Sequence, residues 1–303
     1  MRTMTNTTQS TILLTGANGQ VGFELMRSLQ GLGTLVALDR SRLDLADLDQ
    51  VRAVTRQIKP TLIVNAAAYT AVDRAESEPE LAMLVNGKAP GVLAEEAKRL
   101  GAAIIHYSTD YVFDGAKSGP YVEDDMVNPQ NAYGRSKLAG ERAVAEAGGA
   151  HLVLRTSWVY GRRGSNFLLT MLRLAAERPE LRIVADQYGA PTWCASIASL
   201  TAHVVAQARA VAARDAADWW SEKSGIYHLT ASGSTSWFGF AEAIFELAGQ
   251  ERTPKVVPIA TSDYPLPAKR PANSRLLNDK LACAFGLNAP DWRDALRQAL
   301  AQG

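Results

Sequence analysis

Cysteine is scarce in this sequence, and neither sign of charge is in excess. Only two cysteines occur in 303 residues, Cys194 and Cys283, far apart along the chain. They cannot form the framework of a disulfide-rich secreted protein, and reduced thiols in the cytoplasm fit best. Lysine and arginine number 32 against 31 acidic residues, a formal net charge of +1. We therefore expect a cytoplasmic protein that does not bind nucleic acid, because no basic excess meets the phosphates.

Long hydrophobic runs are also missing. The most apolar stretches, such as 151–160, are interrupted by polar residues well short of a membrane span, so no membrane partner is expected. The first ten residues are polar and lack the apolar core of a secretory signal, which predicts a short disordered extension over 1–10. A hydrophobic content of 47% is enough for one large or two modest domains.

Motifs of metalloproteases, zinc sites and serine hydrolases are absent as well. The sequence contains no H-E-x-x-H, no paired C-x-x-C and no G-x-S-x-G. Its four histidines are scattered, mostly within apolar segments, and are interpreted as structural: His106, His151, His203 and His228. No metal site is predicted.

What the chain does contain is a regular alternation of apolar runs and amphipathic patterns. The runs are apolar enough to be strands buried on both faces: 11–17, 34–40, 61–68, 102–110 and 151–160. Between them, hydrophobic residues recur at helical spacing over 21–30, 45–58, 81–100 and 134–147. This alternation predicts an α/β fold, a Rossmann-type doubly wound parallel sheet over 11–160.

The pattern loosens after residue 160. Segments 181–186 and 225–230 resemble strands, whereas 254–275 holds five of the 13 prolines and is predicted to be a loop. We expect residues 161–303 to form mainly a smaller substrate-binding subdomain that is partly interleaved with the sheet.

A glycine loop follows the first predicted strand. Gly16, Gly19 and Gly22 allow a tight turn and a close approach of the backbone to a pyrophosphate, and the next helix offers its free amides to that anion. The second strand ends at Asp39, whose carboxylate suits the ribose hydroxyls of NAD, while the adjacent Arg40 suits the 2′-phosphate of NADP. The expected cofactor is therefore NADPH or NADH.

Tyr133 and Lys137 stand four residues apart at the start of a predicted helix, on one of its faces. A carbonyl reductase needs a proton donor at the oxygen, and a lysine cation close to a tyrosine lowers the pKa of the phenol. The plainer interpretation is a half-buried tyrosine beside an exposed lysine.

Two strand ends favour the catalytic interpretation. The fourth strand ends at Thr109 and Asp110, at the edge of an α/β sheet where ligands bind, and the threonine hydroxyl can bond the substrate carbonyl. The third strand ends in small alanines, Ala66, Ala67 and Ala68, which leave room for a cofactor or for a packed helix.

Taken together, these motifs resemble the dTDP-4-dehydrorhamnose reductase family of extended short-chain dehydrogenases/reductases. The resemblance runs from about residue 11 to the end, through TGANGQVG, NAAAYTAVDRAE, HYSTDYVFDG, YGRSKLAGE, RTSWVYG, DQYGAPT and PAKRPANSRL. It implies NAD(P)H-dependent reduction of the C4 keto group of the sugar nucleotide dTDP-4-dehydro-L-rhamnose to dTDP-L-rhamnose.

The resemblance also implies roles for single residues. Thr109, Tyr133 and Lys137 would be catalytic. The cofactor would be lined by Gly19, Gln20, Val21, Asp39, Asp44, Leu45, Ala68, Tyr69, Thr70 and Tyr107, and the sugar nucleotide by Thr70, Val72, Asp110, Tyr111 and Trp158. From the proline-rich loop we add Arg270 as a clamp for the substrate diphosphate, since the arginine fork binds phosphate oxygens in pairs; a solvated basic loop is the alternative.

Some family members pair through magnesium held by carboxylates, and Glu24 fits one such position. Ala195 stands where a second carboxylate is needed, so a monomer or weak homodimer without magnesium is expected. Two other functions stay open: a sugar-nucleotide epimerase or dehydratase of the same fold, and a non-catalytic dinucleotide-binding regulatory subunit. Dehydratases carry an Asp-Glu pair after the threonine, but Thr109 is followed by Asp110 and Tyr111.

Overall fold

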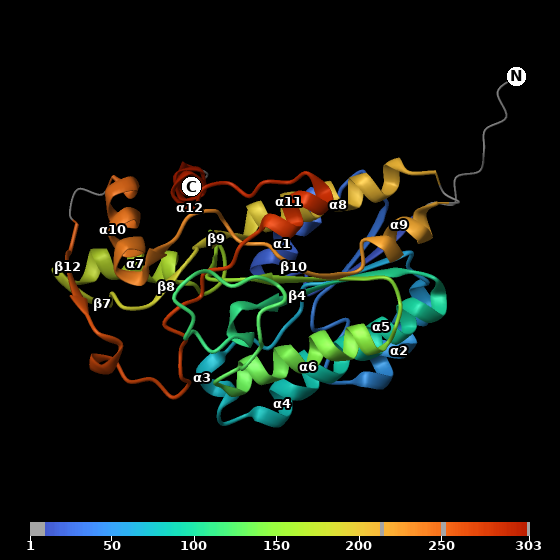
Figure 1. The fold of residues 1–303 in the computed structure, drawn as a ribbon, viewed down its shortest axis with the longest axis horizontal. Coiled ribbons are helices and arrows are strands. Elements are labelled where there is room, and N and C mark those ends of the chain that lie inside the picture. Colours follow the sequence, from blue (N-terminus) through green and yellow to red (C-terminus); the bar gives the residue numbers. More distant parts are fainter. Residues whose placement is uncertain (1–9, 213–214, 250–252, 302–303) are drawn as a thin grey trace, which may run out of the picture.

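The computed structural model describes residues 10–212, 215–249 and 253–301; apart from Ser10, the predicted extension over 1–10 lies outside them. A six-stranded parallel sheet with strand order β10-β5-β4-β3-β1-β2 forms the centre (Figure 1). Its strands are β1 (Thr11–Thr15), β2 (Thr34–Leu38), β3 (Leu62–Asn65), β4 (Ala103–Thr109), β5 (His151–Thr156) and β10 (Gly225–His228). The predicted Rossmann-type fold is confirmed, and the strand order reverses between β1 and β3, where such sheets bind ligands.

Helices cover both faces of the sheet because the central strands are hydrophobic on both sides. Leu14 and Ile105 belong to one core, whereas their neighbours Leu13 and Ile104 belong to the other. The first core lies under α1 (Gln20–Ser28) and α8 (Cys194–Ala210), and the second under α2 (Leu48–Ile58), α5 (Ala89–Leu100) and α6 (Ala132–Glu146). Figure 1 shows these two layers above and below the sheet.

The helix expected over 81–100 is interrupted. It consists of α4 (Pro79–Met83), the π-helical turn η1 (Leu84–Lys88) and α5. The π turn brings Asn86 to the loop after β3, where its side chain bonds both the amide and the carbonyl of Tyr69 at 2.8 and 2.9 Å. Gly140 lets α6 approach this turn, since a Cβ there would lie 2.1 Å from the Asn86 carbonyl oxygen. The turn thus fixes the loop that reaches the site described below.

A second, smaller lobe lies beside the sheet, at the left of Figure 1. Its core is formed by α7 (Phe167–Glu177), α10 (Trp237–Ala248) and α12 (Trp292–Ala301), with the parallel pair β7 (Glu180–Val184) and β12 (Lys255–Ile259). The prediction of a loop over 254–275 is therefore wrong for its first residues, which form β12. Pro258 is tolerated in β12 because both strands of a two-stranded sheet are edges, where a missing amide costs little.

The apolar run 151–160 is not one strand. It forms β5 and then β6 (Val159–Tyr160), which leaves the main sheet to pair with β9 (Thr192–Trp193). Trp158 breaks the run with a left-handed φ of 46°, which is unusual for a bulky residue and is typical of functional sites. The remaining elements are short: α3 (Val72–Ala75), η2 (Asp110–Val112), β8 (Tyr188–Gly189), α9 (Ala216–Glu222), β11 (Thr235–Ser236), η3 (Thr261–Asp263) and α11 (Asp279–Phe285).

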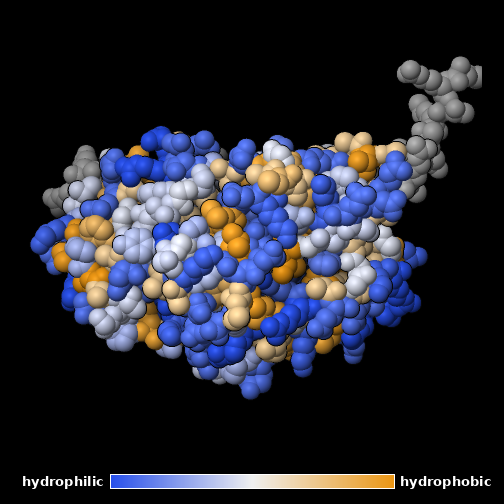
Figure 2. Space-filling view, viewed as in Figure 1, coloured by the Kyte–Doolittle hydropathy of each residue, from blue (hydrophilic) through white to orange (hydrophobic). Residues whose placement is uncertain are grey.

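The surface is mainly polar on the face drawn in Figure 2, where hydrophobic residues form small separate groups. Large hydrophobic side chains exposed in the described part of the chain include Met126, Tyr188 and Tyr264. Within the same residues, every helix is too short or too polar to cross a membrane.

Candidate active site

A cavity of about 740 Å³ opens at the carboxyl ends of β1, β3 and β4. Every residue predicted from the sequence to form the site lines this cavity, apart from Gly22 and Arg270. The structure adds lining residues that the sequence analysis did not assign: Asn18, Leu43, Leu81, Val85, Ser108, Ser157, Val159, Thr156, Gly164, Ser165 and Asn166. The size is within the range of natural ligand sites.

The glycine loop has the shape that a pyrophosphate requires. Gly16 has a φ of 72°, and a Cβ there would lie 2.6 Å from the Ala67 amide nitrogen. Gly22 faces inward instead, where a Cβ would lie 2.0 Å from the Gly16 carbonyl oxygen, so its role is to let α1 pack against the loop. Helix α1 starts after Gly19 without a side-chain cap. Its first amides are therefore available to an anion, and the loop fits a dinucleotide.

At the end of β2, the Asp39 carboxylate accepts hydrogen bonds from Ser41 Oγ at 2.6 Å and Asn18 Nδ2 at 2.8 Å. These bonds, that from Ser41 above all, lower the pKa of Asp39. The side chain of Arg40 is 77% exposed and lies 3.5 Å from Asp44. A carboxylate and an exposed guanidinium therefore stand together where the adenosine ribose of a dinucleotide would lie.

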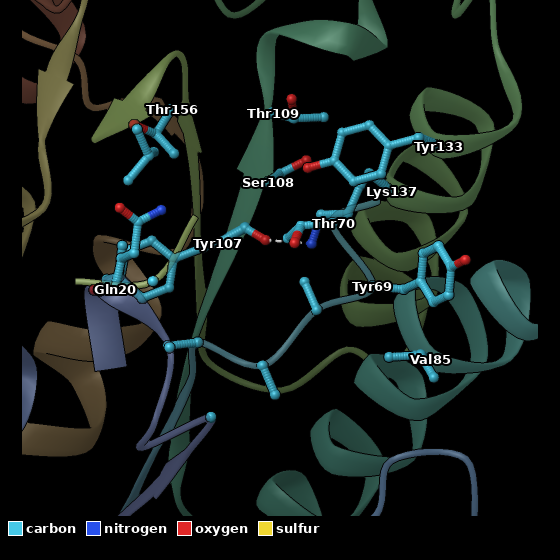
Figure 3. A pocket seen from close by; sticks show the side chains of 18 of the residues that line it. Gln20, Tyr69, Thr70, Val85, Tyr107, Ser108, Thr109, Tyr133, Lys137 and Thr156 are labelled. Atoms are coloured by element: carbon cyan, nitrogen blue, oxygen red, sulfur yellow. Dashed lines mark hydrogen bonds between the residues drawn. The ribbon is translucent and has the colours of Figure 1, made fainter. Parts of the chain in front are cut away.

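Tyr133 enters the cavity from the first turn of α6. The turn is fixed by Asn131, whose side chain accepts a 2.7 Å bond from the Gly134 amide. In Figure 3 the Tyr133 hydroxyl points toward Ser108. Burial raises the pKa of Tyr133 to about 12, with the Thr109 hydroxyl acting in the opposite direction. The expected lowering of this pKa by Lys137 does not appear in the chain alone, where burial is the main cause of the shift and Lys137 is not among its causes.

Lys137 lies one helical turn further on and is 2% exposed. Its Nζ donates a 2.6 Å hydrogen bond to the Tyr107 carbonyl, drawn as a dashed line in Figure 3. Burial lowers the pKa of this lysine to about 8. The amine can thus exchange a proton near neutral pH.

Some polar side-chain atoms at the ends of β4 and β5 have no hydrogen-bond partner within the described part of the chain. Thr109 Oγ1 donates to Asp110 Oδ1 at 2.9 Å, and burial raises the pKa of Asp110 to about 6. Within the described residues, Ser108 Oγ and Thr156 Oγ1 are buried without a hydrogen-bond partner. Both residues line the cavity. Buried groups of this kind are normally paired, so they point to a polar ligand.

Trp158 marks the end of the cavity that faces the smaller lobe. Its ring stacks on Trp237, with centroids 3.6 Å apart and planes at 7°. Gly189 provides the space, because a Cβ there would lie 2.5 Å from the Trp158 ring. Trp237 and Gly189 were not predicted. The DQYGAPT run contained Gly189, but no local signal linked Trp237 to the site.

Arg270 lies outside the cavity lining and is held by an ion pair. Its guanidinium donates two bonds to the Asp73 carboxylate, at 2.9 and 2.7 Å, and its side chain is 20% exposed. Asp73 belongs to α3, next to Val72, which does line the cavity. The pair ties the proline-rich loop to the sheet domain at the edge of the cavity.

Metal ligands do not gather in the described residues, where no group of three His, Cys, Asp or Glu side chains could hold an ion. Glu24 lies close enough to the buried Cys194 to help burial raise the pKa of that thiol to about 12. Ala195, the neighbour of Cys194, offers no ligand.

Comparisons with known proteins identify the family of the chain. A family profile described as "RmlD substrate binding domain" matches residues 10–303. A dTDP-4-dehydrorhamnose reductase from Burkholderia thailandensis is 55% identical over 94% of this chain and 96% of the relative. The reductase of that name from Escherichia coli K12 is 46% identical over 95% and 96%. The crystal structure of a dTDP-4-dehydrorhamnose reductase from Bacillus anthracis in complex with NADP matches with a TM-score of 0.89 at 34% identity, covering 97% of this chain and 100% of that one. The chain belongs to the dTDP-4-dehydrorhamnose reductase family.

Proposed function

We propose that the chain reduces the C4 keto group of dTDP-4-dehydro-L-rhamnose to dTDP-L-rhamnose, with Thr109, Tyr133 and Lys137 as its catalytic residues. The observation that carries this proposal is that all three line one cavity with the glycine loop. NADPH or NADH supplies the hydride when bound. The naming of relatives as reductases over nearly their whole length supports the same reaction.

Each catalytic residue has a distinct task. Tyr133 stays protonated at neutral pH, because its pKa of about 12 lies far above it, and so donates a proton to the substrate oxygen. The Thr109 hydroxyl, which donates to Asp110 Oδ1 in the chain alone, would turn to donate to that oxygen and orient it. Lys137 holds a positive charge near the phenol, which stabilises the phenolate as the proton leaves.

The remaining lining residues would divide between the two ligands. Thr70, Val72, Asp110, Tyr111 and Trp158 would contact the sugar nucleotide at the end of the cavity toward the smaller lobe. Arg270 would reach the substrate diphosphate by exchanging the Asp73 carboxylate for phosphate oxygens. Asp39 and Arg40 would accept either cofactor, since one suits a ribose hydroxyl and the other a 2′-phosphate.

The two alternative functions are less well supported. A dehydratase needs a second acid after the threonine, and Tyr111 cannot serve as one, because its removal from water in a half-buried position raises its pKa. A non-catalytic regulatory subunit would not require Thr109, Tyr133 and Lys137 together in one cavity.

Domain division, assembly and location complete the proposal. A nucleotide-binding unit over 11–160 and a substrate-binding unit over 161–303 would interleave through α8 and β10, which pack with the main sheet. We expect a cytoplasmic monomer or weak homodimer that needs no magnesium, since Ala195 carries no ligand. The mass in solution with and without EDTA tests the last point.

The reaction is tested by mixing the purified chain with NADPH and dTDP-4-dehydro-L-rhamnose. Absorbance of NADPH should fall only with the substrate present, and dTDP-L-rhamnose should appear in equal amount. dTDP-L-rhamnose in place of the substrate is the matched control and should give no loss of NADPH. Cofactor binding without turnover would instead indicate a regulatory subunit.

A further inference from the structure

His106, interpreted from the sequence as structural, lies directly against the catalytic lysine. It sits in the middle of β4, fully buried, and its Nε2 is 3.4 Å from Lys137 Nζ. Gly140 of α6 faces the imidazole, since a Cβ there would be in van der Waals contact with the same nitrogen, at 3.5 Å. The contact therefore joins the sheet to the catalytic helix at the lysine itself.

A row of polar side chains crosses the sheet to reach this histidine. Thr15, Asn65 and His106 are register partners on β1, β3 and β4. Thr15 Oγ1 donates to Asn65 Oδ1 at 2.6 Å, and the amide nitrogen of Asn65 lies 3.0 Å from His106 Nδ1. All three side chains are at most 1% exposed. Such buried networks are costly unless each member is satisfied, which makes their hydrogen bonds directional.

The row selects one tautomer of His106. Because the Asn65 oxygen accepts from Thr15, its amide nitrogen faces the imidazole and donates to Nδ1. A neutral imidazole that accepts at Nδ1 carries its hydrogen on Nε2. Burial, and then the charge of Lys137, hold the pKa of His106 well below its usual range, so the ring is neutral.

The Nε2 hydrogen then points at Lys137 Nζ. An ammonium has no lone pair to accept it, whereas a neutral amine does. Lys137 donates to the Tyr107 carbonyl in either form. We infer that His106 is a positioning residue for Lys137, which through its Nε2 hydrogen favours the neutral amine and keeps the lysine ready to give up a proton.

This inference rests on the proposed function, and it adds a step to it. When the Tyr133 phenol gives its proton to the substrate oxygen, a phenolate remains. A proton from the Lys137 ammonium, passed directly or through a hydroxyl, restores the phenol and leaves an amine. That amine accepts the hydrogen bond of His106. The histidine thus stabilises the lysine in the form that exists after the proton has moved.

Other charged groups around Lys137 act in known directions. Glu141, one turn further along α6, favours the ammonium. Its effect is limited, because both of its oxygens are bonded by the buried Arg155 of β5, at 2.9 and 2.7 Å. Asp110 at the end of β4 raises the pKa of Tyr133. Among these groups, His106 is in direct contact with the lysine nitrogen, and its Nε2 hydrogen disfavours the ammonium form.

The tautomer can be read directly by ¹⁵N NMR of the histidine-labelled chain without ligands. The His106 signals, assigned by their loss in His106→Leu, should show hydrogen on Nε2 alone between pH 6 and 8. Thr15→Val removes the donor that orients Asn65 and should shift these signals. Thr201→Val is the matched control: it removes a buried hydroxyl bonded to Tyr107 on the other face of β4 and should not shift them. Hydrogen on Nδ1, or a charged ring, in the unmodified chain would overturn the inference.

The consequence for Lys137 is read from the pH profile of kcat. Without the Nε2 hydrogen, the lysine keeps its proton to higher pH, so His106→Leu should move the alkaline limb upward by about one pH unit, the size of one hydrogen bond. Thr15→Val should move the alkaline limb in the same direction. If His106→Leu does not fold, Thr15→Val is the variant that tests the inference. An unmoved limb in an active variant contradicts the inference. An inactive unmodified chain with the expected tautomer contradicts the proposed function instead.

Discussion

Trp158 and Trp237 stack face to face across the junction of the two lobes, with ring centroids 3.6 Å apart. Trp158 holds a left-handed φ of 46° and lines the cavity, so the stack positions a residue of the site. Trp237→Ala should therefore raise KM for the sugar nucleotide about 3- to 10-fold, the worth of one aromatic pair. KM for NADPH should not change. Steady-state kinetics with each substrate varied will measure both.

Trp219→Ala is the control for this variant, because Trp219 stacks edge-on with Trp220 in α9, at the opposite end of the molecule in Figure 1. Gly189→Ala attacks the same stack from its other side and should have a larger effect, since the new Cβ would lie 2.5 Å from the Trp158 ring. Equal effects of all three substitutions would show that Trp158 is not positioned by its neighbours.

Arg40 is expected to decide how well NADPH is used. Its side chain is 77% exposed and only loosely paired with Asp44, so it is free to meet a 2′-phosphate. Arg40→Ala should raise KM for NADPH roughly tenfold, as for a lost charge-assisted hydrogen bond, and leave KM for NADH nearly unchanged. The exposed Arg42, which does not line the cavity, provides the control Arg42→Ala. The same loss with both cofactors would place Arg40 away from the 2′-phosphate.

Arg270 and Asp73 allow a test of the diphosphate clamp. If Arg270 leaves Asp73 to bind the substrate, Arg270→Ala should raise the substrate KM about 10- to 150-fold with kcat little changed. Asp73→Asn frees the arginine and should leave that KM unchanged or lower it. A purely structural ion pair predicts the opposite pattern, in which both substitutions raise KM and lower the melting temperature together.

The buried ion pair between Glu141 and Arg155 should matter for stability. Both side chains are 2% exposed, and the guanidinium bonds both carboxylate oxygens. Glu141→Gln leaves a buried charge unpaired and should lower the free energy of unfolding by about 3–5 kcal/mol. Glu177→Gln, in the exposed pair with Arg173, should change it by less than about 0.5 kcal/mol. Urea unfolding of both variants measures these changes. Equal losses in the free energy of unfolding would mean that the burial of an ion pair does not determine the cost of breaking it.

The sheet and the glycine loop were predictable because their signals are local. Apolar runs bounded by turns gave the central strands, and the spacing of Gly16, Gly19 and Gly22 before a helix gave the loop. The end of the run at 151–160 was not predictable, since the left-handed Trp158 is flanked by residues that favour a strand. Strand β12 was missed because the prolines around it suggest a loop. It forms by pairing with β7, which lies about 75 positions earlier in the chain, and the local sequence does not indicate this partner.

Contacts between distant segments lay beyond sequence reasoning. The bond of Arg270 to Asp73 spans 197 positions, and the stack of Trp158 on Trp237 depends on how the smaller lobe docks. The contact of His106 with Lys137 required the register of three strands as well as the rotation of α6. The raised pKa of Tyr133 follows from burial, which the spacing of Tyr133 and Lys137 could not reveal.

The most direct test of the account is kcat for dTDP-4-dehydro-L-rhamnose in the variant Tyr133→Phe. Loss of the proton donor should lower kcat about 10²- to 10⁴-fold, while KM for NADPH and the melting temperature stay near those of the unmodified chain. Tyr111→Phe is a suitable comparison, because the Tyr111 ring packs edge-on against Tyr133, with ring centroids 5.5 Å apart. This substitution also removes a phenol hydroxyl, but it leaves the proton donor Tyr133 in place. The account predicts a much larger fall in kcat for Tyr133→Phe than for Tyr111→Phe; a kcat for Tyr133→Phe close to that of the unmodified chain would contradict it.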